Sequence, residues 1–460
     1  MNRSNDTVQP QKSLAERFLS LFTEVRSGEG VVALLMTLNI FLILTSYLIA
    51  KVVREPLILA GGGAEVKSYS AALQAVVLVV ALRVYTMLVA RFDRRRLINS
   101  VTIFFAACFV LFYGLARAEV PIGVVYYVWV GIFSLMVIAQ FWAFANDAYT
   151  PERGKRLFIV IQFGASAGGV FGPMLARLLL EFFHIHTLLL FSAGILLASL
   201  VITGYLDRIL VRTPAPAAPG KESVPVVTPV EEKISSKGAF GVVFRSRYLL
   251  MIALIVLFTN WVNTTGEYML GKAVTNASHE AVVVEGLGAD EQTDFVRAYI
   301  GKFYSEFFLY VGLAGLLAQL FVVSLVIKFL GVRIAIVILP IVALGGYAVF
   351  LLFPVLGVIR WPKMVENATD YSLNNTVRHI LFLPTTTEEK YKAKVAIDSF
   401  FVRAGDVLSA LVVFVGVNYL SFGIREFAVF NMILVGVWFA IGYKTGTENQ
   451  RLVAQRSGAV

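Results

Sequence analysis

Twelve long apolar stretches recur along the chain, and each is about the length of a membrane-spanning helix. We predict helices near 31–59, 69–90, 97–116, 122–146, 156–183, 186–206, 248–270, 301–329, 332–353, 359–380, 395–421 and 424–444. About 20 apolar residues cross the ~30 Å hydrocarbon core, and only a helix satisfies its own backbone there. The pattern therefore predicts an all-α polytopic membrane protein.

A Pro-rich segment from Pro214 to Pro229 separates two sets of six stretches with similar spacing. This layout is typical of a major facilitator-like architecture, with a substrate site between two six-helix halves. We expect a cytoplasmic N-terminal segment with an amphipathic helix (1–30), an N-terminal half (31–206), a cytoplasmic linker (207–247), a C-terminal half (248–444) and a cytoplasmic tail (445–460). The acidic segment 271–300 is interpreted as an extended or partly helical outer loop, either a lid or a plain solvated loop.

Composition and charge support the membrane class. Of the 460 residues, 58% are hydrophobic and 15% charged, and the mean hydropathy is +0.76. The net charge of +10 comes from basic residues clustered in alternate loops, which places both termini and the linker in the cytoplasm by the positive-inside rule. No basic patch is interleaved with aromatic residues on a soluble domain, so a nucleic-acid partner is not expected.

The residue types that mark enzymes and metal sites are scarce. Cys108 is the single cysteine, and the four histidines lack ligand spacing. We therefore expect no catalysis, no metal and no cofactor. Gly164, Gly168, Gly169 and Gly172 lack the GxxxxGK[ST] pattern of a phosphate loop, and close helix packing explains them better.

Two apolar stretches carry polar stripes. Asn260, Asn263, Thr264 and Glu267 share one helical face, and Glu366, Asp370, Asn374 and Arg378 follow each other four residues apart. Such stripes face a cavity rather than lipid. They either line a pathway or join helices to one another within the bundle.

Several cations also fall inside apolar stretches, where each costs about 2.5–3.5 kcal/mol on insertion scales. Arg83 has no acidic residue three or four positions away, so its partner must be another helix or a ligand. Its guanidinium makes it the best single candidate for an anionic contact. By contrast, the pairs Lys394 with Asp398 and Arg403 with Asp406 have helical spacing, so part of this set can be structural.

Three segments resemble the ATP/ADP antiporters of plastids and obligate intracellular bacteria. FWAFANDAYTPERGKRLFIVIQFGASAGGVFGPMLA (141–176) is similar to that family's FWGFAN run and the charged loop after it. LPTTTEEKYKAKVAIDSFFVRAGDVLSAL (383–411) is similar to its KGKAAID segment, and YLIAKVVREPLIL (47–59) follows the spacing of its Y-x-x-x-R-D-x-K-D. The resemblance implies a divergent bacterial relative in the cytoplasmic membrane.

The resemblance also implies site residues. Lys51, Arg54 and Glu55 stand at charged first-helix positions of the family, Lys394 at a functional lysine, and Glu267 at its seventh-helix acid. The chain departs from the pattern at Val130, where the family has glutamate, and at Asp406, where the family has a basic residue.

The leading hypothesis is a secondary transporter that exchanges nucleotides, or a related phosphorylated anion, by alternating access. The candidate substrate-binding residues are Lys51, Arg54, Arg83, Asn146, Glu267, Asp370, Asn374, Arg378 and Lys394, and Tyr47 and Trp142 are candidates for stacking on a base. Unpaired cations in the empty cavity are expected to oppose closure, which would enforce exchange. The expected partners are the anionic substrate and the lipid bilayer, and the protein is expected to act as a monomer.

Two other functions stay open at this point. One is proton-coupled transport of another organic ion, with Glu267 or Asp370 as the titrating carboxylate. The other is a membrane sensor or scaffold that binds a ligand or partner and transports nothing.

Overall fold

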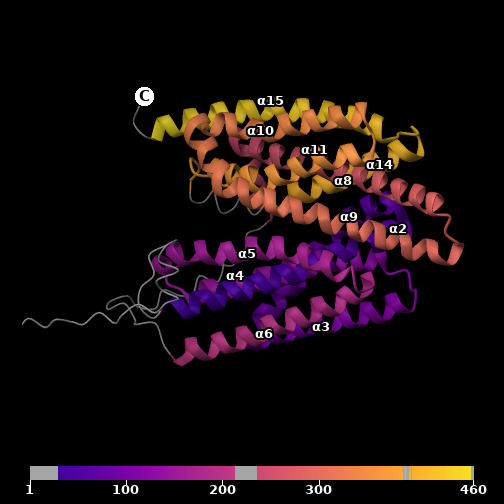
Figure 1. The fold of residues 1–460 in the computed structure, drawn as a ribbon. Helices are drawn as coiled ribbons and strands as arrows, with labels where there is room; N and C mark the ends of the chain where they lie inside the picture. Colours follow the sequence, from indigo (N-terminus) through magenta and orange to yellow (C-terminus); the bar gives the residue numbers. More distant parts are fainter. Residues whose placement is uncertain (1–28, 213–235, 387–388, 390–392, 395, 457–460) are drawn as a thin grey trace, which may run out of the picture. The chain divides into compact units, whose positions relative to one another are not determined.

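The computed structural model describes residues 29–212, 236–386, 389, 393–394 and 396–456 (Figure 1). The expected amphipathic helix, most of the linker and the end of the tail lie outside these residues. Across the described part of the chain the secondary structure is helical, with no β-strand.

The helices follow one another with short connections. In the first part of the chain they are α2 (Gly30–Arg91), α3 (Arg94–Arg117), α4 (Gly123–Ala148), α5 (Pro151–Leu179), the short η1 (Ile185–Thr187) and α6 (Leu188–Arg212). After the linker come α7 (Ser236–Arg245), α8 (Arg247–Glu285), α9 (Ala289–Leu317), the π-helix η2 (Ala318–Val322), α10 (Val323–Leu352) and α11 (Leu356–Thr369). The π-helix η3 (Asp370–Asn374), α12 (Asn375–Leu381), the π-helix η4 (Ile397–Phe401), α14 (Val402–Asn418) and α15 (Ile424–Arg456) complete the order.

Nine helices among the described residues are long and apolar enough to cross a membrane. Two of them, 30–89 and 291–352, are about 60 residues long and are each bent at a glycine, so each provides two passes. The continuous run of α11, η3 and α12 provides one more. The all-α, twelve-pass architecture expected from hydropathy is confirmed.

The first bend corrects the sequence-based helix boundaries. Residues 60–68 were expected to connect two helices, but within α2 only Gly63 leaves helical geometry (φ 74°, ψ −177°). A positive φ of this kind suits glycine, which has no Cβ to clash. Lys67, expected in a loop, is therefore a helical residue and is only 5% exposed.

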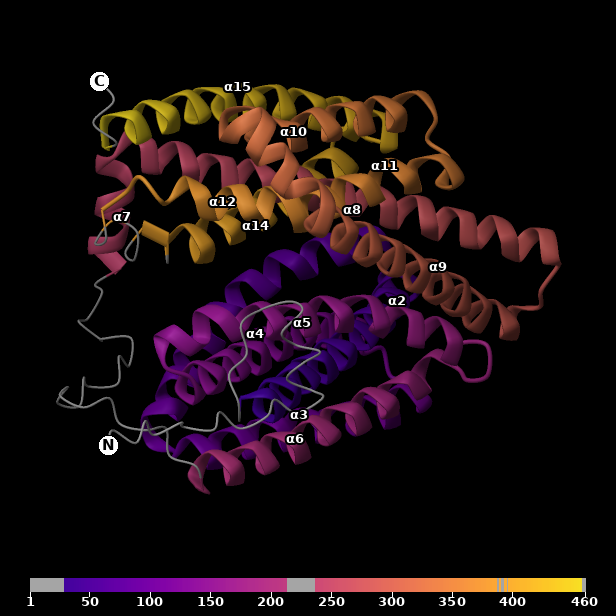
Figure 2. The ribbon, with the colours of Figure 1, turned by 60° about the vertical axis from the view of Figure 1, so that its left-hand side comes forward.

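The expected outer loop 271–300 is also helical. α8 continues to Glu285, Gly286 caps it in the left-handed conformation, and α9 begins at Ala289. The 39 residues of α8 span about 58 Å, well beyond a ~30 Å hydrocarbon core. The α8–α9 hairpin consequently extends past α11 and α15 (Figure 2). Likewise, the last helix runs to Arg456 rather than ending near residue 444.

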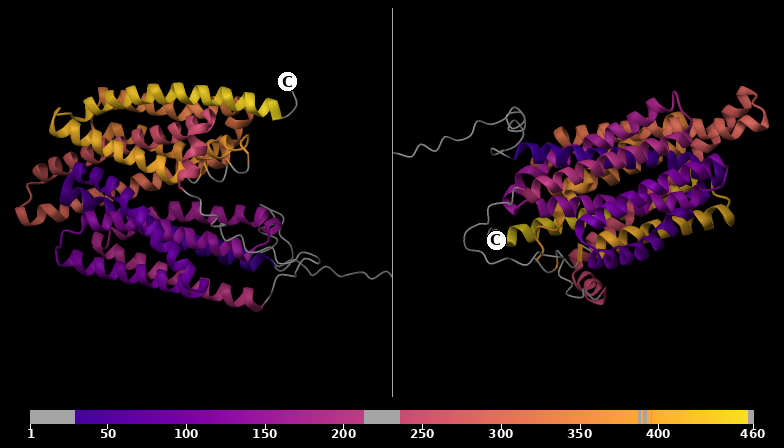
Figure 3. Two further views of the ribbon diagram at one scale, coloured as in Figure 1. Left: turned by 180° about the vertical axis from the view of Figure 1, so that it is seen from behind. Right: turned by 90° about the horizontal axis from the view of Figure 1, so that it is seen from below.

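The described residues form two compact units. The first unit contains residues 29–51, 85–118 and 132–212, and the second contains 52–84, 119–131 and 236–456. In the second unit α15 packs along α10 and α8, and α14 packs against α8 (Figure 3). The division into halves 31–206 and 248–444 follows chain topology and stays a prediction.

Within the first unit, glycines on α5 allow a close approach to α2. A Cβ at Gly164 or Gly168 would lie 2.5 Å from the carbonyl oxygen of Thr37 or Phe41, and one at Gly172 would lie 2.9 Å from that of Thr45. Such small residues let helix backbones meet closely. The packing role expected for the α5 glycines is confirmed for these three, whereas Gly169 faces open space.

We expect Gly168→Ala to lower the melting temperature of the detergent-solubilised protein, because its methyl group would overlap backbone atoms of Phe41. Overpacking of this kind costs about 1–3 kcal/mol. Gly169→Ala is the matched control, since no atom lies within 4 Å of its added Cβ. Equal melting temperatures for the two variants would contradict the packing role.

Candidate functional site

A network of buried charges lies in the second unit around the Gly63 bend. Because the bend reverses the direction of α2, Lys67 returns toward Arg54 and Glu55. The Lys67 Nζ lies 2.7 Å from Glu55 Oε2. The Nε of Arg54 donates to Glu55 Oε1 at 3.0 Å, and its second terminal nitrogen also pairs with that oxygen. Glu55 thus pairs with two cations, and its side chain is only 1% exposed.

Aromatic side chains surround both cations. The Arg54 guanidinium lies 4.5 Å from the centre of the Tyr127 ring, a cation–π contact. The Lys67 ammonium lies 5.0 Å from the centre of the Tyr304 ring and donates to the Tyr304 hydroxyl at 3.4 Å. Each ring face interacts favourably with the positive charge beside it.

Lys67 also connects α2 to α8. Its Nζ lies 3.8 Å from Oε2 of Glu267, whose other oxygen accepts a hydrogen bond from the Asn367 amide at 3.0 Å. A second α2–α8 link lies two residues earlier, where Glu65 Oε1 accepts from Lys272 at 2.6 Å and from Tyr268 at 3.0 Å. The segment after the bend is therefore held to α8 by two ion pairs.

A second ion pair adjoins this network on α11. Lys363 is fully buried, and its ammonium donates to Glu366 at 3.0 Å and to the side-chain oxygen of Asn263 at 2.7 Å. The Tyr347 hydroxyl donates to the same Glu366 carboxylate at 3.1 Å. Breaking a buried pair of this kind leaves an uncompensated charge, which is strongly destabilising.

The charges of the network balance. Arg54, Lys67 and Lys363 supply three positive charges, and Glu55, Glu267 and Glu366 supply three negative charges. Arg54 is the only one of these three cations among the predicted site residues, and the expectation that it is unpaired is wrong, because it pairs with Glu55. The reason is physical: a charge removed from water without a partner is far more costly than a paired one.

The structure brings only part of the predicted site together. Arg54 and Glu267 belong to the network, whereas Arg83 is exposed and lies 16 residues beyond Lys67, about 24 Å along the helix. Asn146, at the end of α4, is exposed as well. Lys51 is half-buried on α2 and is assigned to the first unit.

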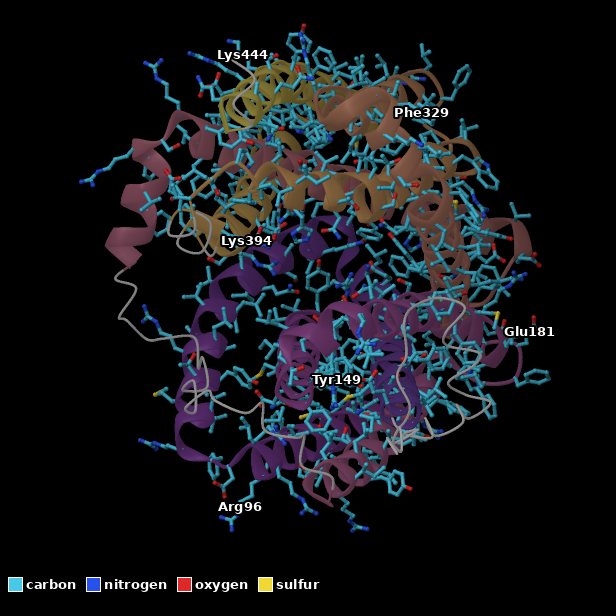
Figure 4. The ribbon with its side chains drawn as sticks, turned by 90° about the vertical axis from the view of Figure 1, so that its left-hand side faces the viewer. Arg96, Tyr149, Glu181, Phe329, Lys394 and Lys444 are labelled. Carbon is cyan, nitrogen blue, oxygen red and sulfur yellow. The ribbon has the colours of Figure 1, made fainter. Side chains whose placement is uncertain are left out.

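The tenth-helix stripe is satisfied locally. The Asn374 amide donates to Asp370 at 2.7 Å within the π-helix η3. Arg378 forms an ion pair with Asp398 of η4 at 2.6 Å. Lys394, labelled in Figure 4, lies 3.2 Å from Nδ1 of His379. The i,i+4 spacing had suggested Asp398 as the partner of Lys394, but Asp398 pairs with Arg378 instead.

The two aromatic candidates pack against other rings of the first unit. Tyr47 lies 6.4 Å from Phe133, and Trp142 lies edge-on to Phe141 and Phe158. These contacts account for both side chains as packing residues. Their stacking on a base stays a prediction.

A cavity in the first unit is too small for a metabolite. It has a volume of about 20 Å³ and is lined by polar side chains including Asn39, Thr102 and Gln140. The Asn39 Oδ1 and both polar atoms of Gln140 are buried without a hydrogen-bond partner. Its size and chemistry fit a single ordered water. The described residues also hold no group of three or more His, Cys, Asp or Glu side chains that could bind a metal.

Sequence reasoning missed four members of the network: Lys67, Lys363, Tyr127 and Tyr304. Lys67 was assigned to a loop because the bend at Gly63 shortens the apparent apolar run. The spacing of Lys363 and Glu366, three residues apart inside an apolar stretch, was an available signal. The two tyrosines had no such signal, since their partners are distant in sequence.

Comparison with known proteins agrees with this architecture. The family model described as Major Facilitator Superfamily matches residues 30–365. The chain belongs to the major facilitator superfamily. It is therefore a multi-pass membrane protein and a secondary transporter of this type, a class of carriers that are generally not enzymes.

Solved structures of other major facilitator proteins share the fold. A bacterial homologue of the iron transporter ferroportin, in an inward-facing state, superposes with a TM-score of 0.60 at 12% identity, covering 90% of this chain and 98% of that one. A bacterial homologue of the human lysosomal transporter Spinster gives 0.57 at 13% identity, covering 92% and 98%. The nucleoside transporter NupG gives 0.57 at 12%, covering 90% and 98%. No curated protein matches this chain.

We expect Lys363→Met to destabilise this transporter by about 3–5 kcal/mol, because it leaves the buried Glu366 carboxylate without its cation. The double variant Lys363→Met/Glu366→Gln should recover much of that loss. Thermal or denaturant unfolding in detergent measures both. A double variant less stable than the single one would contradict the charge-pair explanation.

Proposed function

We propose that this major facilitator protein exchanges nucleotides, or a related phosphorylated anion, across the membrane by alternating access. The observation that carries the proposal is the convergence of Arg54, Lys67 and Lys363 in one buried network. Placing a cation inside the membrane costs free energy, and binding of an anionic substrate is a function that such cations can perform. The resemblance of the segments 47–59, 141–176 and 383–411 to ATP/ADP antiporters supports the same substrate class.

The related structures leave the substrate open. One neighbour is named as a nucleoside transporter and another as a human organic anion transporter, with TM-scores of 0.57 and 0.53. Another is named as a D-xylose–proton symporter, so the fold accommodates uncharged solutes as well. The choice of an anion therefore depends on this chain's own charges.

The ion pairs between α2 and α8 provide a reason for exchange. The empty protein has no excess positive charge in the network, so charge repulsion cannot block its return. The pairs Lys67 with Glu267 and Lys272 with Glu65 instead hold the bend of α2 to α8. The Lys67–Glu267 pair is the longer of the two, at 3.8 Å against 2.6 Å, so it is the one that substrate binding would break to open a passage beside this bend.

Proton-coupled transport is the second candidate, and the charge balance favours it. An anion that enters a neutral network adds uncompensated negative charge unless a carboxylate takes up a proton. Glu267 has the most exposed side chain of the three acids, at 23%, and Asp370 lies on η3, four residues after Glu366. Either group could accept that proton from water.

The membrane placement belongs to the same proposal. We place the protein in a bacterial cytoplasmic membrane with both termini cytoplasmic, from the basic residues in alternate loops. The Gly63 bend and the α8–α9 turn then lie on the outer side. Binding of the substrate between the halves 31–206 and 248–444 is part of this proposal, as is function as a monomer.

Uptake of labelled ATP into proteoliposomes tests the coupling. We expect fast uptake into vesicles preloaded with ADP and little into empty vesicles, with no dependence on a pH gradient. Equal uptake with and without internal ADP would contradict exchange. Uptake into empty vesicles that follows an imposed pH gradient would establish the proton-coupled alternative. Binding without any uptake would indicate a sensor.

We expect Lys67→Gln to reduce ATP exchange by about ten- to hundredfold, since one charge-assisted hydrogen bond to an anion is worth that much. Lys444→Gln, which removes an exposed lysine of α15, is the control and should exchange like the wild type (Figure 4). Equal loss in both variants would point to net charge rather than to the network.

A further inference from the structure

Lys67 has two carboxylate partners that differ in distance and burial. Glu55 lies 2.7 Å from the ammonium, and its side chain is 1% exposed. Glu267 lies 3.8 Å away, and its side chain is 23% exposed. A separation of 3.8 Å is too long for a hydrogen bond, so this attraction is purely coulombic. Glu267 is therefore the partner that a ligand can reach and replace.

Glu267 also has other groups to interact with when it leaves Lys67. Its Oε1 already accepts from the Asn367 amide at 3.0 Å, and the buried Lys363 attracts the same carboxylate. Departure from Lys67 would thus not leave a negative charge without compensation.

We propose that the Glu267 carboxylate is an internal substitute for the anionic group of the substrate. In the empty protein it interacts with the Lys67 ammonium, and a phosphate or carboxylate oxygen of the substrate replaces it there. Buried Lys67 requires a negative partner, and a ligand that displaces a carboxylate must offer an anionic oxygen in return. The Tyr304 hydroxyl, 3.4 Å from the ammonium, lies where it can donate to that oxygen.

This replacement couples binding to opening. Lys67 belongs to α2 and Glu267 to α8, so their attraction holds the bend of α2 to α8 when no substrate is bound. A bound anion takes Lys67 away from Glu267 and removes that link. The empty carrier stays closed beside the bend, and the loaded carrier opens. Obligatory exchange then follows, because only a bound substrate breaks the ion pair between Lys67 and Glu267. The inference rests on the proposed anion transport.

The test is Glu267→Gln, which removes the more distant of the two carboxylates beside Lys67 and keeps side-chain size. We expect the Kd for ATP and for inorganic phosphate, from thermal-shift titration in detergent, to fall about ten- to hundredfold, the value of one charge-assisted hydrogen bond. In proteoliposomes, uptake of ATP should lose its dependence on internal ADP, because the empty carrier can now return.

Glu65→Gln is the matched control. It breaks the other ion pair between α2 and α8, at 2.6 Å, but does not touch Lys67. Its affinity for ATP and phosphate should equal that of the wild type. Adding Lys67→Gln to Glu267→Gln should remove the gain in affinity, because the ammonium group that binds the anion is then absent.

A folded Glu267→Gln protein with unchanged or weaker affinity would overturn the inference, as would a gain of equal size in Glu65→Gln. If the amide variant does not fold, Glu267→Asp withdraws the carboxylate by one methylene, and its affinity should rise by a smaller factor; no rise overturns the inference. Failure of the proposed function looks different. The wild type would then neither bind nor exchange ATP, and the phosphate titration alone would test the replacement at Lys67.

Discussion

The Glu55 carboxylate, held between Arg54 and Lys67, is the interaction on which the rest of the network depends. A lone carboxylate or ammonium in a low-dielectric interior costs several kcal/mol, so none of these groups could be buried without the others. The Gly63 bend makes the arrangement possible, because it brings Lys67 back to a residue twelve positions earlier. Tyr127 and Tyr304 complete the shell around the two cations. The bend at Gly63 therefore determines where Lys67 meets Glu55.

Pairing also limits what the network can do with a substrate. Because internal carboxylates already satisfy every cation of the network, an external anion gains only the difference between its own interaction and the one it displaces. Binding is then weaker than three buried, unpaired cations would give, but a ligand without negative charge cannot displace a carboxylate at all. The ion pairs therefore lower the affinity for the substrate and raise the selectivity for anions. Lower affinity suits a carrier that must also release its substrate.

The sequence predicts the fold well because hydropathy reports on the membrane directly. Each pass needs about 20 apolar residues whatever its tertiary partners, so the twelve passes were recognisable. The glycines of α5 were also recognisable, since close helix packing leaves a periodic trace at Gly164, Gly168 and Gly172. The expected loop 271–300 is different. Its acidic residues indicate exposure to water, but an exposed segment can be a helix as easily as a loop, and the end of α8 and the start of α9 occupy it.

The ion pairs could be predicted only where both partners lie on one helix. Arg403 and Asp406, three residues apart, do pair at 3.1 Å. Lys394 and Asp398 do not, because Arg378 from another helix lies closer to Asp398. The pairs of Lys67 with Glu267 and of Glu267 with Asn367 join residues 200 and 100 positions apart, and no local pattern identifies them. Local spacing therefore reveals candidates for pairing, while tertiary structure selects among them.

The same competition explains why Arg83 and Lys67 differ. Arg83 was prominent in the sequence because no acid lies at helical spacing, and the structure leaves it exposed. Lys67 was inconspicuous, yet it is the cation that two carboxylates from different helices share. An anion that binds an exposed side chain such as Arg83 does not have to enter a buried network of ion pairs. Lys67 is buried, and one of its two carboxylate partners can be replaced by an anion. That replacement removes the ion pair between α2 and α8, and the loss of this link allows the helix to move.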